Sequence, residues 1–146
     1  MPTICQVKQF SNWNVTKVGS MYYVVEMAFG HYCSNGEPLS PDRIESAKNL
    51  GLSTLYDLFS GGRVNDCKGG YKSAVDGRCV LEPCSLFTAD AKEVRENDWT
   101  QLLLLASEIA TELEQECVLI TIHRVDGTMH WVKPDASTSE RGEQAA

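Results

Sequence analysis

The last third of the chain constrains the fold most, because it joins an amphipathic helix to two strand-like segments. Asp98 and Gln101 resemble a capping box. Apolar residues then recur at helical spacing, at Trp99, Leu102, Leu103, Ala106, Ile109, Ala110 and Leu113. Residues 117–125 and 128–133 are strand-like, and Asp126-Gly127 between them is a strong turn signal. The sequence therefore predicts a helix followed by a β-hairpin.

Three earlier segments extend the expected order of elements. Residues 3–10 predict a short strand, and residues 20–29, rich in Tyr and Val on both faces, predict a central strand. A helix should begin after Ser40, which suits the N-cap, while Pro41 suits the first helical position. Gly51 is expected to end this helix.

The middle of the chain is the hardest part to assign. Residues 60–70 are rich in glycine and predict a loop. Residues 71–87 predict a second hairpin that turns at Asp76-Gly77. Because Pro83 cannot donate a ladder hydrogen bond, the returning strand should be an edge strand or bend there.

Together these segments predict an α+β fold, a mainly antiparallel sheet with two helices packed on one face, as in a ferredoxin-like variant. A chain of 146 residues that is 42% hydrophobic can bury one ordinary core. We therefore expect one domain over residues 1–134. Residues 135–146 are polar and small, and we expect a disordered C-terminal tail.

Composition and charge narrow the expected partners. The formal net charge of -7 argues against direct binding of nucleic acid, which needs clustered Lys and Arg. No run of eighteen apolar residues is present, and residues 1–10 lack the pattern of a secretory signal. We expect a soluble cytoplasmic protein that does not bind membranes and that prefers a basic partner.

The cysteines offer one weak metal site. We expect reduced thiols, because nothing in the sequence implies an oxidising compartment. Tetrahedral zinc needs four ligands, although no Cys-x-x-Cys pair is present. The candidates are His31, Cys33, Cys67, Cys79 and Cys84. The alternative is buried thiols acting as small apolar groups, and no cofactor is expected beyond this zinc.

The predicted last hairpin places two histidines opposite one another. With Asp126-Gly127 at the turn, His123 pairs with His130, and Thr121 shares their face. Paired imidazoles can bind a metal or a phosphate, or act as general acid and base. Neither histidine lies in the His-x-Thr or His-x-Ser motif of two-histidine phosphoesterases. A structural or merely exposed pair is the alternative.

Carboxylates gather around the predicted second helix. Such a face can meet a basic groove on a protein partner, or it can simply be solvated. The candidates for partner binding are Glu93, Glu96, Glu112 and Glu116.

Three segments resemble the landmarks of an uncharacterised bacterial domain family. Residues 25–30 (Val-Glu-Met-Ala-Phe-Gly) are similar to its Glu-Leu-Tyr-Phe-Gly landmark, and residues 115–119 (Gln-Glu-Cys-Val-Leu) to its Gln-Glu-Ser-Val-Leu landmark. Leu81-Glu82-Pro83 lies between them. The resemblance covers roughly residues 22–125 and implies strand and helix-end positions but no catalytic residues.

The leading functional hypothesis is a small acidic protein that docks onto a basic protein partner. Its size suits a phage or mobile-element protein that inhibits a host nucleic-acid-handling defence machine. The alternative is a small-ligand-binding or metal-assisted hydrolytic domain that uses His123 and His130. No complete catalytic motif is present, so the balance leans away from an enzyme.

Overall fold

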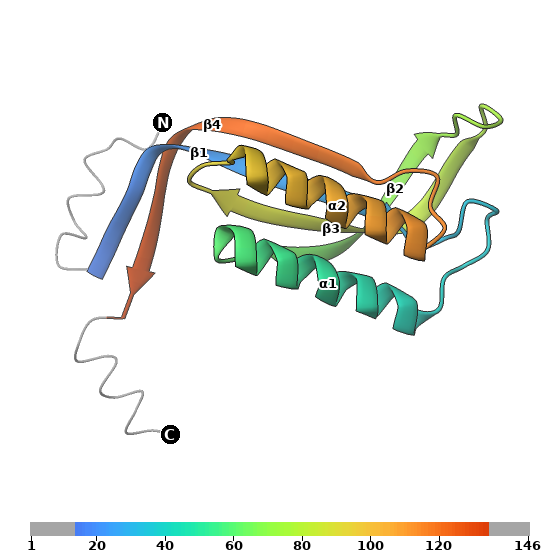
Figure 1. Cartoon of the computed structure of the whole chain (residues 1–146), viewed down its shortest axis with the longest axis horizontal. Coiled ribbons are helices and arrows are strands. Elements are labelled where there is room, and N and C mark those ends of the chain that lie inside the picture. The colour runs from blue at the N-terminus through green and yellow to red at the C-terminus, as the bar shows by residue number, and fades with distance from the viewer. Residues whose placement is uncertain (1–13, 135–146) are drawn as a thin grey trace, which may run out of the picture. The chain divides into compact units, whose positions relative to one another are not determined.

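The structure, a computed structural model, describes residues 14–134, with side chains from Met21 onward. Its elements are β1 (Asn14–Gly30), α1 (Pro41–Phe59), β2 (Arg63–Lys72), β3 (Cys79–Ala91), α2 (Glu96–Glu112) and β4 (Leu119–Lys133). The sheet has the order β2-β3-β1-β4, and β3 is antiparallel to both β1 and β2 (Figure 1). This βαββαβ arrangement is ferredoxin-like, which confirms the predicted fold class.

The chain forms two compact units. Tyr22–Val125 is the larger and contains both helices, β2 and β3. The other unit comprises the residues up to Met21 and those from Asp126 onward. Its described part consists of strand residues 14–21 and 126–133, followed by Pro134. The strand predicted at 3–10 and the tail predicted at 135–146 lie outside the described residues, and the expectation of one domain stays a prediction.

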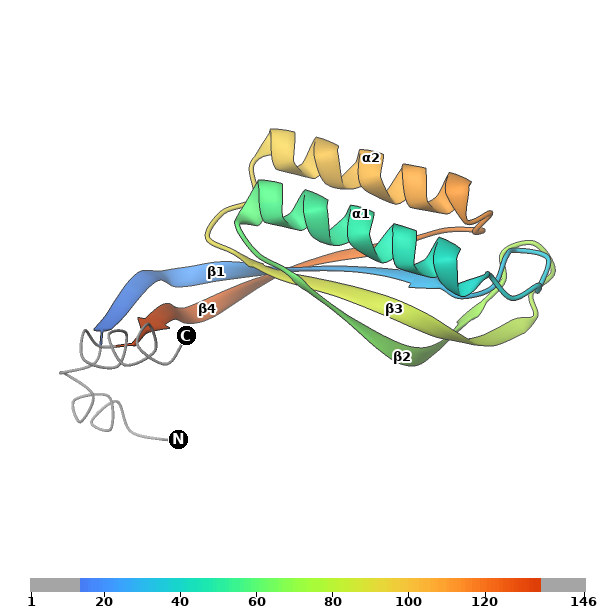
Figure 2. The same ribbon diagram turned by 90° about the horizontal axis from the view of Figure 1, so that it is seen from below.

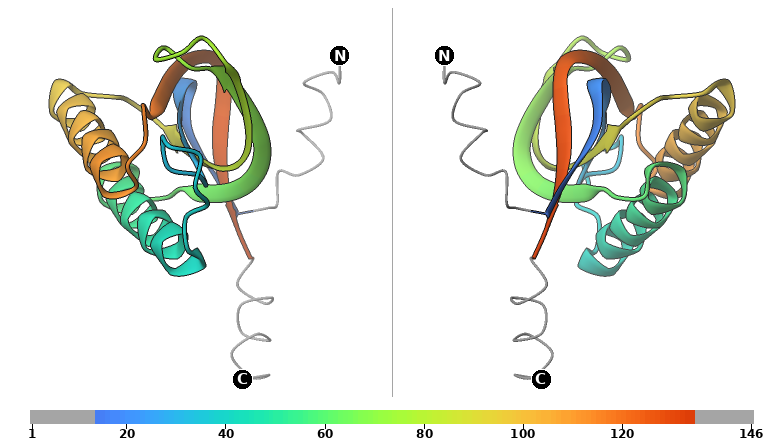
Figure 3. Two further views of the ribbon diagram at one scale, coloured as in Figure 1. Left: turned by 90° about the vertical axis from the view of Figure 1, so that its right-hand side faces the viewer. Right: turned by 90° about the vertical axis from the view of Figure 1, so that its left-hand side faces the viewer.

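The core of the larger unit lies between the helices and one face of the sheet (Figures 2 and 3). Alternate residues of β1, namely Val25, Met27 and Phe29, are buried opposite Ala89, Phe87 and Ser85 of β3. The helices contribute Ala47, Leu55, Leu102, Leu105, Ala106 and Ile109. The central position in the sheet that was predicted for residues 20–29 is confirmed.

Helix α1 begins as predicted but does not end at Gly51. The Ser40 hydroxyl accepts a hydrogen bond from the Arg43 amide (3.3 Å), and Pro41 is the first helical residue. At Gly51 a Cβ would lie 2.3 Å from the Phe87 ring. The glycine therefore lets the helix approach the sheet, and the helix ends at Phe59, with Ser60 as its C-cap at a φ of 64°.

The predicted glycine-rich loop at 60–70 is wrong beyond Gly62, because β2 starts at Arg63. Gly69 lies opposite Glu82 in the ladder, where a Cβ would meet the Cys84 sulfur at 2.9 Å. Glycine at this position therefore allows the two strands to pack closely. The predicted hairpin exists and Gly77 has a φ of 72°, but six residues, 73–78, join the strands in place of a two-residue turn.

Pro83 lies in an interior strand, so the first of the two alternatives predicted for the returning strand, an edge position, is wrong, and a bend at Pro83 stays a prediction. The register with β1 ends one residue away, at the pair Gly30 and Cys84. The Pro83 carbonyl accepts from His31 N (2.9 Å). Pro83 is therefore tolerated where the ladder between β1 and β3 ends.

Helix α2 starts two residues before the predicted Asp98. Asp98 is the third helical residue, 4% exposed, and its carboxylate accepts from the Arg95 amide (2.9 Å). The predicted capping box of Asp98 with Gln101 is therefore wrong, because Arg95 is the N-cap residue and Asp98 completes a capping box with it. Trp99 and Leu103, which belong to the apolar positions predicted at helical spacing, are 39% and 46% exposed.

The predicted last hairpin is wrong. Asp126-Gly127 continues the strand, and β4 runs unbroken to Lys133, just before Pro134. Because β4 lies beside β1 in the sheet order, strand pairing overrides the local turn preference. Within the described residues, no helix is long and apolar enough to cross a membrane.

Candidate functional site

Three segments far apart in the sequence meet at one end of the larger unit. They are the end of β1 with the loop that follows it, the hairpin of β2 and β3, and the residues after α2. Figure 2 shows the loop and the hairpin tip next to each other. Side chains of all three line one pocket of about 320 Å³.

Glu82 is the most unusual group at this end. It belongs to β3, is 6% exposed, and accepts a hydrogen bond from the Tyr32 amide (3.0 Å). A Cβ on Gly30 would lie 2.0 Å from Glu82 Oε1, so the carboxyl group rests on the Gly30 backbone. Burial raises the pKa of Glu82, against the opposing effect of the Tyr32 hydrogen bond.

Gln115 fixes the end of β1 beside this carboxyl group. Its Oε1 accepts from the Gly30 amide (2.9 Å), and its Nε2 donates to the carbonyls of Gly30 (3.1 Å) and Tyr32 (2.7 Å). The preceding Glu114 has a φ of 52°, which turns the chain after α2 toward β1. The Gln115 amide thus holds the backbone on which Glu82 rests.

The Glu116 side chain holds the hairpin of β2 and β3 by hydrogen bonds, as Gln115 holds the end of β1. Its carboxylate accepts from the Ser73 hydroxyl (3.0 and 3.2 Å) and from the Ala74 amide (2.7 Å). The consecutive residues Gln115 and Glu116 therefore tie two different segments to the end of α2. Both ties join residues more than forty positions apart, so this end depends on long-range contacts.

Tyr71 connects the buried carboxyl group to the pocket. It lies on β2, lines the pocket together with Tyr32, and is 38% exposed. Burial raises the pKa of the Tyr71 phenol, and the nearby carboxylates of Glu82 and Glu116 add to this effect. Tyr71 is therefore a neutral hydrogen-bond donor at neutral pH and is poorly suited to act as a base.

The arrangement offers a cation a place to bind. Among the side chains described, no Lys, Arg or His forms a salt bridge with Glu82. A carboxylate buried without a cationic partner favours protonation or the arrival of a positive ligand. The aromatic rings of Tyr32 and Tyr71 supply flat apolar surface in the adjoining pocket.

A second polar cluster lies on the helix-facing side of the same sheet. The buried Ser85 hydroxyl donates to Asp66 (2.9 Å) and contacts His31 Nε2 (2.7 Å), while Lys48 of α1 pairs with Asp66 (2.8 Å). Burial lowers the pKa of His31, and Asp66 opposes this effect. Ser85 is fully buried, so the cluster joins α1 to the sheet and exposes no nucleophile.

The histidine pair predicted from the last hairpin is not formed. His123 and His130 lie in the same strand. His123 Nε2 lies 3.5 Å from Glu26, and His130 Nε2 lies 2.8 Å from the hydroxyl of Thr128. Thr121 is half-buried in β4. A ligand role for Thr121 and the two histidines stays untested.

The five predicted zinc ligands are spread over several contacts. Cys33 lies near Glu114 (3.8 Å) and His31 contacts Ser85, whereas Cys79 is exposed at the start of β3. Only Cys67 and Cys84 adjoin, with sulfurs 3.0 Å apart. In the described part of the chain, no three His, Cys, Asp or Glu residues are gathered to hold a metal ion.

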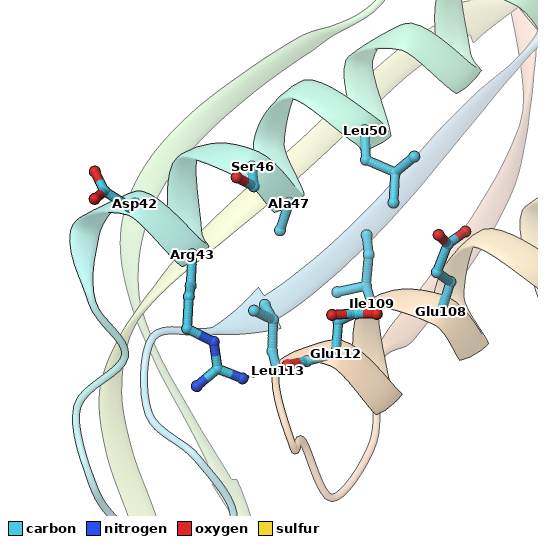
Figure 4. Close-up of a pocket in the computed structure, with 9 residues that line it drawn as sticks. All are labelled: Asp42, Arg43, Ser46, Ala47, Leu50, Glu108, Ile109, Glu112 and Leu113. Atoms are coloured by element: carbon cyan, nitrogen blue, oxygen red, sulfur yellow. Dashed lines mark hydrogen bonds between the residues drawn. The ribbon is translucent and has the colours of Figure 1, made fainter.

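The predicted acidic docking residues lie at separate points along α2 and on either side of it, and their role in docking stays a prediction. Glu93 lies near Arg95 before α2, Glu96 begins the helix, and Glu112 ends it. Glu116 is engaged with the hairpin. Glu112 does line a groove of about 370 Å³ between the helices (Figure 4). The other residues lining it include Asp42, Arg43, Leu50 and Glu108.

The sequence contained a signal for this end of the molecule. The segments 25–30, 81–83 and 115–119, noted for their resemblance to a family, bring Gly30, Glu82 and Gln115 into contact. The resemblance was interpreted as strand and helix ends that bring no catalytic residues, and it did not predict that these segments meet. Tyr71 carried no recognisable signal.

Comparisons with known proteins extend the fold assignment. No family model and no curated protein matches the sequence. A phage SAM lyase in complex with S-methyl-5'-thioadenosine is similar in structure, with a TM-score of 0.57, 14% identity, and coverage of 79% of this chain and 91% of that chain. The apo form of a phage SAM lyase gives 0.55, with 14% identity and 83% and 95% coverage. CutA from Synechococcus elongatus gives 0.44, with 7% identity and 88% and 90% coverage. At these identities the likeness concerns the fold.

Proposed function

We propose that the chain binds S-adenosylmethionine in the pocket lined by Tyr32 and Tyr71, with Glu82 beneath it, and cleaves it as a lyase. The buried carboxyl group of Glu82, which forms no salt bridge among the side chains that the structure describes, carries this proposal, because the ligand is a cation with both a sulfonium and an ammonium group. The pocket volume of about 320 Å³ suits a nucleoside-sized ligand. The fold shared with a phage SAM lyase supports the same reaction class.

The Glu82 carboxylate suits the ammonium group better than the sulfonium. Cleavage of the carbon–sulfur bond converts the sulfonium into a neutral thioether, so a carboxylate beside sulfur would stabilise the reactant more than the transition state. The ammonium keeps its charge throughout. Glu82 therefore anchors the amino-acid half, and the tyrosines Tyr32 and Tyr71 border the space left for the adenosine half.

A lyase needs no water for this cleavage. The carboxylate of the substrate can attack its own Cγ, forming a carbon–oxygen bond while the electrons of the carbon–sulfur bond pass to sulfur. The products are a lactone and S-methyl-5'-thioadenosine, and no proton is transferred. The protein then has to hold the substrate folded for ring closure, and orientation of this kind supplies much of an enzymatic rate.

The test incubates the purified full chain with S-adenosylmethionine in ¹⁸O-labelled water and identifies the products by mass spectrometry. We expect S-methyl-5'-thioadenosine and an unlabelled lactone as the first products.

Glu82→Gln should lower kcat/KM by at least about 100-fold, as expected when a buried charge contact is lost. Glu108→Gln, an exposed carboxylate of α2, is the matched control and should retain activity. No thioadenosine from the wild-type protein, or full activity of Glu82→Gln, would refute the proposal.

The groove between the helices favours a second candidate, docking of a basic protein partner. Asp42, Glu108 and Glu112 line it beside the apolar Leu50 (Figure 4). Reversal of Glu108 and Glu112 to Lys should abolish capture of a basic partner and leave product formation at Glu82 unchanged. Capture that is insensitive to the reversal would exclude this surface.

The two candidates predict different routes to a host machine. A protein that consumes S-adenosylmethionine would deprive a methyl-transferring defence enzyme of its methyl donor without touching it. A docking protein would need the enzyme itself. Activity of the purified chain in the absence of any partner therefore separates them.

A further inference from the structure

We propose that Cys67 and Cys84 form a reversible disulfide that ties β2 to β3 beside Glu82. The two residues are direct partners in the antiparallel register, and their sulfurs are 3.0 Å apart. Both are free thiols in the structure. The inference stands on these cysteines alone and is independent of the function proposed for Glu82.

The strand geometry suits such a bond. Directly opposite residues in an antiparallel pair have Cα atoms about 4.5–5.5 Å apart, within the range of about 4.4–6.8 Å that disulfides span. The neighbouring Gly69 adds room, because a Cβ there would fall 2.9 Å from the Cys84 sulfur. The two sulfurs can thus approach without a side chain between them.

The surroundings differ between the two thiols. Cys67 is exposed, while Cys84 is half-buried. Burial raises the pKa of the Cys84 thiol to about 12, and its hydrogen bond with Cys67 adds to the effect. The thiolate is the reactive form, so Cys84 is a poor first attacker at neutral pH and Cys67 is the group that meets an external oxidant.

The chemistry balances with a small disulfide such as oxidised glutathione. The Cys67 thiolate attacks one glutathione sulfur, forming a mixed disulfide and releasing one glutathione thiolate. The Cys84 thiolate then attacks the Cys67 sulfur, forming the protein disulfide and releasing the second glutathione. The two cysteines lose two protons and two electrons, and one oxidised glutathione becomes two reduced molecules.

The proposed disulfide would lie close to Glu82. Cys84 and Glu82 are two residues apart on β3 and therefore lie on the same face of the sheet. Glu82 is opposite Gly69, which also adjoins the Cys84 sulfur. A bond at this position would fix the strand pair that carries the Glu82 carboxyl group.

The experiment exposes the full chain to oxidised glutathione, blocks the remaining thiols with iodoacetamide, and maps the peptides by mass spectrometry. We expect a cross-link between Cys67 and Cys84 that dithiothreitol reverses and that forms faster as the pH rises above neutral. Cys79→Ser is the matched control, because Cys79 is an exposed thiol of β3 that lies opposite Lys72. This variant should still form the link.

Cys84→Ser should lose the link and leave Cys67 as a glutathione adduct. Two results would overturn the inference. One is a wild-type protein in which Cys67 and Cys84 are alkylated as completely as Cys79. The other is linkage of Cys67 to Cys79 in equal yield, which would reflect exposure of the thiols without any effect of register. Both are read from the wild-type protein, so a variant that fails to fold leaves the test intact.

Discussion

The carboxyl group of Glu82 lies against the backbone of Gly30, where any Cβ would fall 2.0 Å from its Oε1. Gly30 is therefore required for a close approach, since it has no positive φ that would call for glycine. The Gly30 amide and carbonyl are both bonded to Gln115, so the backbone cannot easily retreat from an added side chain.

Gly30→Ala should displace the Glu82 carboxyl group while the rest of the sheet persists. We expect at least about a tenfold loss of affinity for S-adenosylmethionine, the cost of about 1.4 kcal/mol of binding free energy, measured by calorimetry. Gly61→Ala is the control, because a Cβ at Gly61 meets nothing within 4 Å. Unchanged affinity of Gly30→Ala would separate ligand binding from the position of Glu82.

The raised pKa of Glu82 predicts a specific dependence of stability on pH. Glu82 binds its proton more tightly in the folded state than in the unfolded state, where its pKa lies near 4.5. At a pH between the two pKa values, the native protein therefore binds more protons than the unfolded chain. The free energy of unfolding should therefore fall as the pH rises through this window. Glu82→Gln removes this effect and keeps an oxygen for the Tyr32 amide.

We expect the stability of Glu82→Gln relative to the wild type to increase from pH 4 to pH 8 in urea titrations. Glu108→Gln should show no comparable trend. A difference between Glu82→Gln and the wild type that stays constant over this range would contradict the buried, unpaired position of Glu82.

Much of the fold was predictable because it depends on local signals. Ser40 and Pro41 start a helix by capping chemistry, and the Tyr and Val residues on both faces of 20–29 correctly indicated a central strand. The turn signal at Asp126-Gly127 failed because pairing in the sheet overrides local preference. Gly51 and Gly69 misled for a related reason, since both serve contacts with residues distant in the sequence.

The candidate site was less predictable than the fold. Its groups come from segments separated by tens of residues, and none forms a short motif. Glu82 is one of many carboxylates in an acidic chain, and only its position in the fold distinguishes it: Glu82 is buried, and the salt bridges of the described side chains do not include it, whereas the equally buried Asp98 pairs with Arg95. The histidines and the helix carboxylates stood out by residue type or clustering. In the structure, His123 pairs with Glu26 and His130 contacts Thr128. Glu112 lines an exposed groove.

The contact between Gly51 and Phe87 predicts a steric cost. Gly51→Ala places a Cβ 2.3 Å from the Phe87 ring, and overpacking of this kind costs about 1–3 kcal/mol. Ala favours a helix over Gly by about 1 kcal/mol. We expect a net loss of about 1 kcal/mol in the free energy of unfolding, measured by thermal or urea unfolding. Ser53→Ala, an exposed position in the same helix, should be neutral or slightly stabilising.

The cluster around Asp66 predicts a pH dependence of the opposite sign. Hydrogen bonds from Lys48 and Ser85 lower the pKa of Asp66 below its ordinary 3.8. The unfolded state therefore binds the Asp66 proton more tightly than the folded state does. The ionised Asp66 carboxylate stabilises the fold, and this contribution is complete above the unfolded pKa. It is lost as the pH falls through the lower folded pKa.

Asp66→Asn should be less stable than the wild type at pH 7 and should approach the stability of the wild type in strong acid. The exposed Asp57→Asn in α1 is the control in urea titrations at pH 7 and pH 3, and an equal deficit of Asp66→Asn at both values would show that the loss is steric rather than electrostatic.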